Sequence, residues 1–178
     1  MPHTQSLIAE SLIPSATLLV ADGQCPKIRE LLANAKVPLL WLGDEKDPLK
    51  IISETLAGRR EQGQPVQALH WVSHGNPGVL QVGQQRVDHP ALVAASDQLI
   101  HWQVDQLALW ACEYGADNSA LSLLEELVGA SVYSSGGILG LDADGQTHWT
   151  LNSKKHNITI NWPLELGQNS AWNHQLSI

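Results

Sequence analysis

The sequence predicts an α/β fold in which a mostly parallel sheet carries helices on both faces. Short apolar runs alternate with stretches of helical periodicity along residues 16–135, and this order is typical of parallel α/β sheets. The 178 residues suit one domain that buries roughly two-thirds of its unfolded surface. No internal repeat, low-complexity tract or linker divides the sequence.

The main elements follow in order from this alternation. The expected strands are short apolar runs, and they cover residues 16–22, 37–43, 66–74, 105–113 and 131–135. The expected helices carry apolar side chains three or four positions apart, and they cover residues 25–35, 47–60, 90–100 and 116–129. Asp47 before Pro48 is the expected N-cap of the second helix. Asp117 or Asn118 caps the last one, which Gly129 ends.

Smaller elements complete the predicted fold. Residues 78–90 form an expected hairpin that turns at residues 83–85. The stretch 134–140 predicts a flexible connection that could also line a substrate groove. Two further strands are expected at 147–152 and 156–163, and the second alternates apolar and polar residues, which indicates a half-exposed strand.

Residues 1–178 are expected to form a single domain whose core spans 16–162, with 1–15 and 163–178 peripheral. The net charge of −8 argues against nucleic acid and anionic membrane surfaces as partners, because both reward clustered Lys and Arg. No apolar run approaches the ~20 residues that a membrane span needs. Residues 1–23 lack a basic head before their apolar residues, so no N-terminal signal peptide is expected.

Two candidate catalytic residues follow apolar runs of the predicted sheet. His74 ends the third expected strand, and Cys112 lies at the end of the fourth. Catalytic groups gather at the carboxyl ends of parallel strands, so the two side chains would meet there if their strands are neighbours. A thiol becomes a strong nucleophile as the thiolate, and a nearby imidazole can take its proton. The pair therefore predicts a cysteine nucleophile with a histidine base.

Gly75 and the backbone at Cys112 suggest how such a site would bind a carbonyl oxygen. Glycine lets a substrate carbonyl approach a backbone N–H, so the N–H groups of Gly75 and Cys112 are the expected oxyanion hole. Each of the two catalytic candidates also has a structural interpretation. His74 could be a strand-end histidine bonded to a turn carbonyl, and Cys112 an inert buried thiol, since cysteine is among the most buried residue types.

Neither a metal nor an organic cofactor is expected. Two cysteines, Cys25 and Cys112, cannot form a Cys-only zinc site. His70 and His74 lie four residues apart on a strand pattern, hence ~13 Å from each other, too far for one ion. Residues 142–145 begin like a calcium loop, but the glycine is misplaced and no glutamate closes the loop, which favours a surface turn.

The motifs around His74 and Cys112 resemble those of a known group. An apolar strand ending in His-Gly, then an apolar strand ending in Ala-Cys, is similar to the caspase-like cysteine peptidases, which include caspases, legumains, gingipains and clostripain. The closer resemblance is to an uncharacterised bacterial family found near the N-termini of very large surface adhesins. It rests on four ordered motifs within residues 16–162, which lie at 73–78, 112–116, 127–135 and 149–151.

This resemblance implies a caspase-like, three-layer αβα sandwich with a mostly parallel sheet of about six strands and added C-terminal strands. It implies His74 as the catalytic histidine and Cys112 as the nucleophile. The Gly75 and Cys112 N–H groups would bind the oxyanion. The candidate substrate groove comprises Ser73, Asn76, Glu113, Tyr114 and Ser135.

The implied activity is metal-independent hydrolysis of peptide bonds through an acyl-enzyme. The partner would be a peptide or protein substrate, its own polypeptide included, in a bacterial surface or secreted context. Caspases place Gln before Ala-Cys and Arg or Gln after it, whereas this chain has Trp110 and Glu113, so aspartate specificity is not supported. Two alternatives stay open: a catalytically silent module for adhesion or assembly, and another thiol enzyme such as an acyl transferase.

Overall fold

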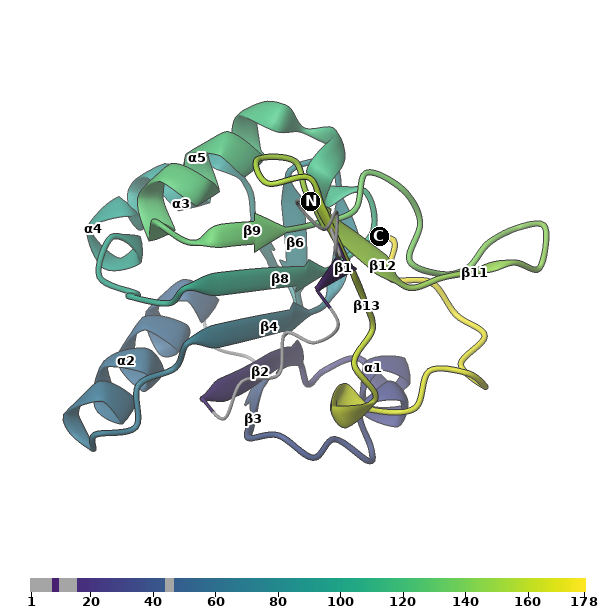
Figure 1. Ribbon diagram of the computed structural model, residues 1–178, viewed down its shortest axis with the longest axis horizontal. Coiled ribbons are helices and arrows are strands. Elements are labelled where there is room, and N and C mark those ends of the chain that lie inside the picture. The colour runs from purple at the N-terminus through teal and green to yellow at the C-terminus, as the bar shows by residue number, and fades with distance from the viewer. Residues whose placement is uncertain (1–7, 10–15, 44–46) are drawn as a thin grey trace, which may run out of the picture.

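The computed structural model describes residues 8–9, 16–43 and 47–178. Its centre is a sheet of five parallel strands, which confirms the predicted α/β class with one strand fewer than the six expected (Figure 1). The strands lie in the order β3 (Leu39–Leu42), β2 (Thr17–Asp22), β4 (Ala68–Val72), β8 (Gln106–Trp110) and β9 (Ser131–Tyr133). β4 and β8 are therefore neighbours, as the candidate site requires.

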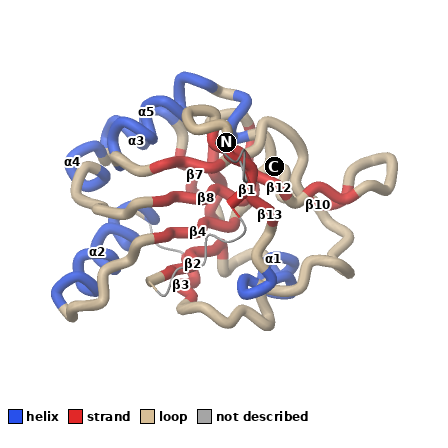
Figure 2. Tube along the Cα trace, in the orientation of Figure 1, coloured by secondary structure: helices blue, strands red, loops and turns tan. Residues whose placement is uncertain are grey.

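Four helices cover one face of this sheet (Figure 2). They are α2 (Pro48–Glu61), α3 (His89–Ala94), α4 (Ser96–Leu99) and α5 (Asn118–Val128). Side chains such as Ile52 and Leu124 pack with Leu109 of β8 in one apolar cluster on this face. The helix expected over residues 90–100 is present as the short pair α3 and α4.

The helix ends follow the sequence closely. Asp47 accepts a hydrogen bond from the Lys50 N–H at 3.1 Å and caps α2. Asp117 accepts one from the Ala120 N–H at 3.0 Å and caps α5, whereas Asn118 is the first helical residue. Gly129 ends α5 with φ of 65°, a left-handed conformation that glycine adopts without strain.

The second face of the sheet does not carry the layer of helices that the sequence predicted. Among the described residues only α1 (Pro26–Leu31) packs there as a helix. Extended segments provide the rest of the cover, chiefly the antiparallel pair β12 (Thr150–Ser153) and β13 (Ile158–Asn161). β13 also pairs with β1 (Ile8–Ala9).

Residues 163–178 are part of this cover, although the sequence predicted them to be peripheral. Leu166 of the 3₁₀ turn Leu164–Leu166, Trp172 and Leu176 are buried in the apolar cluster that also contains Cys112. Of the N-terminal stretch that was also expected to be peripheral, residues 1–7 and 10–15 lie outside the described part. The core therefore reaches close to the last residue of the sequence.

Small antiparallel sheets extend from the carboxyl ends of the central strands. The predicted hairpin is β6 (Val79–Val82) and β7 (Gln85–Val87), and β5 (His74–Asn76) adds a third strand that the sequence did not indicate. A second hairpin joins β10 (Gly140–Leu141) to β11 (Thr147–His148). No helix in the described part of the chain is long and apolar enough to cross a membrane.

Candidate active site

The parallel register brings the two candidate catalytic residues to the same level of the sheet. Val72 of β4 is the partner of Trp110 of β8, and His74 and Cys112 each lie two residues beyond this pair. The Ser73 N–H continues the pairing by donating to the Trp110 carbonyl oxygen at 3.3 Å. The two strands therefore deliver an imidazole and a thiol to one edge of the sheet.

The backbone N–H groups of Gly75 and Cys112 converge on one oxygen atom. Both donate to the Leu176 carbonyl oxygen, at 2.8 and 3.0 Å respectively. An oxyanion hole needs two donors that converge in this way. The two N–H groups named from the sequence therefore point to one position, which the chain's own Leu176 carbonyl oxygen occupies.

Gly75 fits this place because it has no side chain. A Cβ atom there would lie 2.7 Å from the Ala111 Cβ and 2.8 Å from the Cys112 carbonyl oxygen. Both distances are far below ordinary contact, and the second involves backbone that cannot rotate away. The close approach of the two strand ends therefore requires glycine at position 75.

The Cys112 thiol is enclosed by the segment that follows β9. Cys112 has no exposed surface, and its Sγ accepts a hydrogen bond from the Leu139 N–H at 3.1 Å. Burial raises the pKa of the thiol, and the nearby Glu113 carboxylate adds to this rise, while the N–H groups of Leu139 and Leu176 oppose it. At neutral pH the sulfur is therefore protonated and needs a base to become a nucleophile.

Burial also changes the pKa of the His74 imidazole. It is half-buried, and burial lowers its pKa below the ordinary value, while the Asp22 carboxylate pulls the pKa back upward. The imidazole is therefore neutral at pH 7 and able to accept a proton.

Asp22 also lies near the His74 ring, although it was not among the site residues expected from the sequence. It ends β2, the other neighbour of β4, and its carboxylate accepts hydrogen bonds from the Gln24 and Gly83 N–H groups at 3.0 and 3.1 Å. The side chain is buried, with 4% of its surface exposed. Its place at the carboxyl end of a predicted strand was the sequence signal that could have marked Asp22 as a candidate site residue.

Residues 174–178 run through the site as an extended segment. On one side they pair antiparallel with β10, because the Leu176 N–H donates to the Leu139 carbonyl at 3.1 Å and the Leu141 N–H donates to the His174 carbonyl at 2.9 Å. On the other side Ser177 bridges to Gly75 in parallel. The end of the chain accordingly lies beyond the tips of β4 and β8 in Figure 1.

The residues predicted to line a substrate groove separate into two groups. Asn76, Glu113 and Ser135 are half-buried around the strand ends. Ser73 differs from the expectation, because it is fully buried and its hydroxyl accepts from the Trp71 indole and donates to the His74 carbonyl. Tyr114 also differs, since its buried ring packs in the helix-covered cluster, on the face opposite Cys112.

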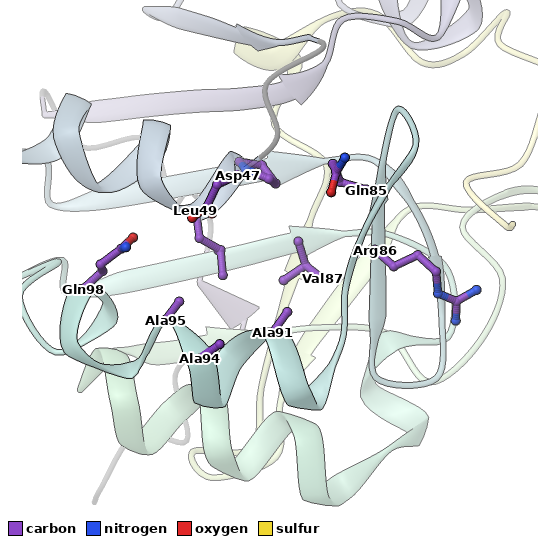
Figure 3. Close-up of a pocket in the computed structure, with 10 residues that line it drawn as sticks. Asp47, Leu49, Gln85, Arg86, Val87, Ala91, Ala94, Ala95 and Gln98 are labelled. Atoms are coloured by element: carbon purple, nitrogen blue, oxygen red, sulfur yellow. The ribbon is translucent and has the colours of Figure 1, made fainter.

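A surface hollow lies away from this site, between the start of α2, β7 and the α3–α4 pair (Figure 3). Asp47 and Arg86 are its charged residues, and Asp47 already serves as a helix cap. It contains no nucleophile and no histidine. In the described ranges, no three His, Cys, Asp or Glu side chains gather as a metal site would require.

Comparison with known proteins gives one match. The model of a family described as Domain of unknown function (DUF4347) matches residues 18–176. The chain belongs to this family. The expectation of an uncharacterised domain family is thus confirmed, and the matched range includes Leu176. No curated protein and no solved structure matches the chain.

Proposed function

We propose that this DUF4347 domain is a caspase-like cysteine endopeptidase with a three-layer αβα core, in which His74 and Cys112 form the catalytic dyad. The observation that carries the proposal is the convergence of the Gly75 and Cys112 N–H groups on one peptide carbonyl oxygen, at 2.8 and 3.0 Å. An inert strand-end cysteine has no need of two donors aimed at a single oxygen beside its sulfur. The substrate would be a peptide or protein in a bacterial surface or secreted context.

The chemistry proceeds in two steps. His74 takes the thiol proton of Cys112, and the sulfur attacks the substrate carbonyl carbon while the two N–H groups stabilise the oxyanion. His74 then returns the proton to the amine nitrogen, the C–N bond breaks and a thioester on Cys112 remains. Water, deprotonated by His74, hydrolyses this thioester to a carboxylate and restores the thiol.

A catalytically silent module for adhesion or assembly is the second candidate. It is favoured by the enclosure of Cys112, which has no exposed surface and bonds to the Leu139 backbone through its thiol. In such a module the strand-end contacts would only anchor residues 174–178 to the sheet.

Hydrolysis of a broad peptide library distinguishes the two candidates. We expect the wild-type chain to cleave library members, and His74→Ala and Cys112→Ala to reduce the rate at least ~100-fold. Cys25→Ala is the matched control and should leave the rate unchanged, because Cys25 lies at the start of α1. A folded wild-type chain that keeps its full mass and cleaves no member of the library would favour the silent module instead.

A further inference from the structure

The 174–178 segment has the backbone arrangement of a bound peptide. Its antiparallel bridge to β10 and its parallel bridge to β5 hold it between two segments that flank the strand ends. Adding an extended strand to an exposed strand edge is a general mode of peptide recognition, in which main-chain hydrogen bonds supply much of the affinity. The same type of contact would seat an external peptide.

The position of Leu176 identifies which peptide carbonyl meets the two backbone donors. Its carbonyl oxygen takes both donors of the oxyanion hole, from Gly75 and Cys112. Its N–H donates to the Leu139 carbonyl oxygen at 3.1 Å, and the Leu139 N–H donates to the Cys112 sulfur at 3.1 Å. In the proposed reaction the Leu176 carbonyl carbon is the atom that Cys112 would attack, and the bond that would break leads to the nitrogen of Ser177.

The Leu176 side chain indicates the kind of residue that the site accepts before the cleaved bond. It is fully buried in the apolar cluster that contains Cys112, Leu139 and Tyr133. A charged side chain placed there would lose its hydration without gaining an ionic partner.

A glycine in β10 allows the backbone of the 174–178 segment to approach closely. Gly140 has φ of 99°, and a Cβ atom there would collide with the His174 carbonyl oxygen. The backbone of β10 therefore lies directly against the backbone at His174, two residues before Leu176, whose carbonyl oxygen meets the two donors.

We infer that the domain cleaves its own chain at the Leu176–Ser177 bond, with residues 174–178 as an intramolecular substrate. This inference rests on the proposed peptidase function and names its substrate. The Cys112 sulfur forms a thioester with the Leu176 carbonyl carbon, and the Ser177 nitrogen leaves as an amine with the proton that His74 carries. Water then splits the thioester, which leaves a Leu176 carboxylate and the Cys112 thiol. Until the cut, the segment closes the site to other peptides.

The test is the intact mass of the purified 178-residue chain during incubation at neutral pH. We expect wild type to lose Ser177 and Ile178 at a rate independent of protein concentration, as an intramolecular reaction requires. Cys112→Ala should keep its full mass. Ser177→Pro should slow the loss at least ~100-fold, because proline makes the bond a tertiary amide without an N–H. Ser177→Ala is the matched control and should be cut at the wild-type rate.

A second measurement separates failure of this inference from failure of the proposed function. The same preparations are assayed against a peptide that copies residues 172–178 and against the peptide library. Hydrolysis of library peptides by a chain that keeps its full mass would overturn self-cleavage and leave the peptidase standing. Equal loss of the last two residues by wild type and Cys112→Ala would also overturn it. Full mass with no hydrolysis of any peptide would overturn both.

Discussion

The two faces of the central sheet are covered in different ways, and the candidate site belongs to the second of them. Helices α2 to α5 cover the first face with apolar side chains that interdigitate with the sheet. The second face has α1, the pair β12 and β13, and the extended residues 163–178. The first cover is held by side-chain packing over whole helices, whereas residues 174–178 are held by backbone hydrogen bonds and by one fully buried side chain, that of Leu176.

The difference in cover implies that the helix-covered face serves as a stable scaffold, whereas the cover of the candidate site can open. Segments attached by few contacts open locally at a lower free energy than packed helices do. Residues 174–178 can therefore leave the strand ends while the helix-covered face keeps the sheet intact. A site under such a cover can be closed in one state and accessible in another.

The largest expected effect compares one buried leucine on each face. Leu109→Ala should lower the free energy of unfolding by about 2–5 kcal/mol, because a cavity opens in the centre of the helix-covered cluster. Leu176→Ala should cost less, since the segment can detach and thereby limit the loss. Urea unfolding of both variants measures the comparison. Equal losses would mean that the segment is as integral to the fold as β8.

The second prediction uses two glycines. Gly75→Ala should lower the free energy of unfolding by about 1–3 kcal/mol, because its Cβ would lie 2.7 Å from the Ala111 Cβ. Gly58→Ala in α2 is the matched control, where nothing lies within 4 Å of an added Cβ. It should stabilise the fold by about 0.5–1 kcal/mol, since alanine favours a helix. A neutral Gly75→Ala would show that the strand ends are loosely packed.

A smaller effect is expected in the pH dependence of stability. The His74 pKa is lowered from 6.5 in the folded state, so the unfolded chain takes up the proton first and stability falls as pH drops below 6.5. The Cys112 pKa is raised from 9.0, so the unfolded chain ionises first and stability falls as pH rises above 9.0.

Substitutions at His74 and Cys112 should each remove one of the two pH-dependent losses of stability, the acid limb and the alkaline limb of the profile. His74→Gln should flatten the acid limb, and Cys112→Ala the alkaline limb, in unfolding free energies measured across a pH series that spans both values. Cys25→Ala serves as the control for the alkaline side. If His74→Gln leaves the acid limb unchanged, His74 is not the group that titrates there.

The sequence predicts the parts of the molecule that side-chain patterns determine. The strands of the central sheet, the caps Asp47 and Asp117, and the position of His74 and Cys112 at strand ends follow from periodicity and known strand-end chemistry. That β4 and β8 are neighbours came from the structure. Among the features that escaped prediction, two have a clear physical reason. Residues 174–178 bind mainly through backbone groups, which every residue has, and the single buried side chain of Leu176 makes no pattern. Asp22 influences the pKa of His74 because β2 pairs with β4, and the order of elements along the chain does not reveal which strands pair.

The most direct test of the central claim is labelling by a chloromethyl ketone of the peptide Asn-His-Gln-Leu, which copies residues 173–176. We expect mass spectrometry to find one adduct, on Cys112, and His74→Ala to slow its formation at least ~100-fold while the fold persists. Labelling of Cys25 as fast as Cys112, or reaction of the folded His74→Ala chain at the wild-type rate, would contradict a His74–Cys112 dyad.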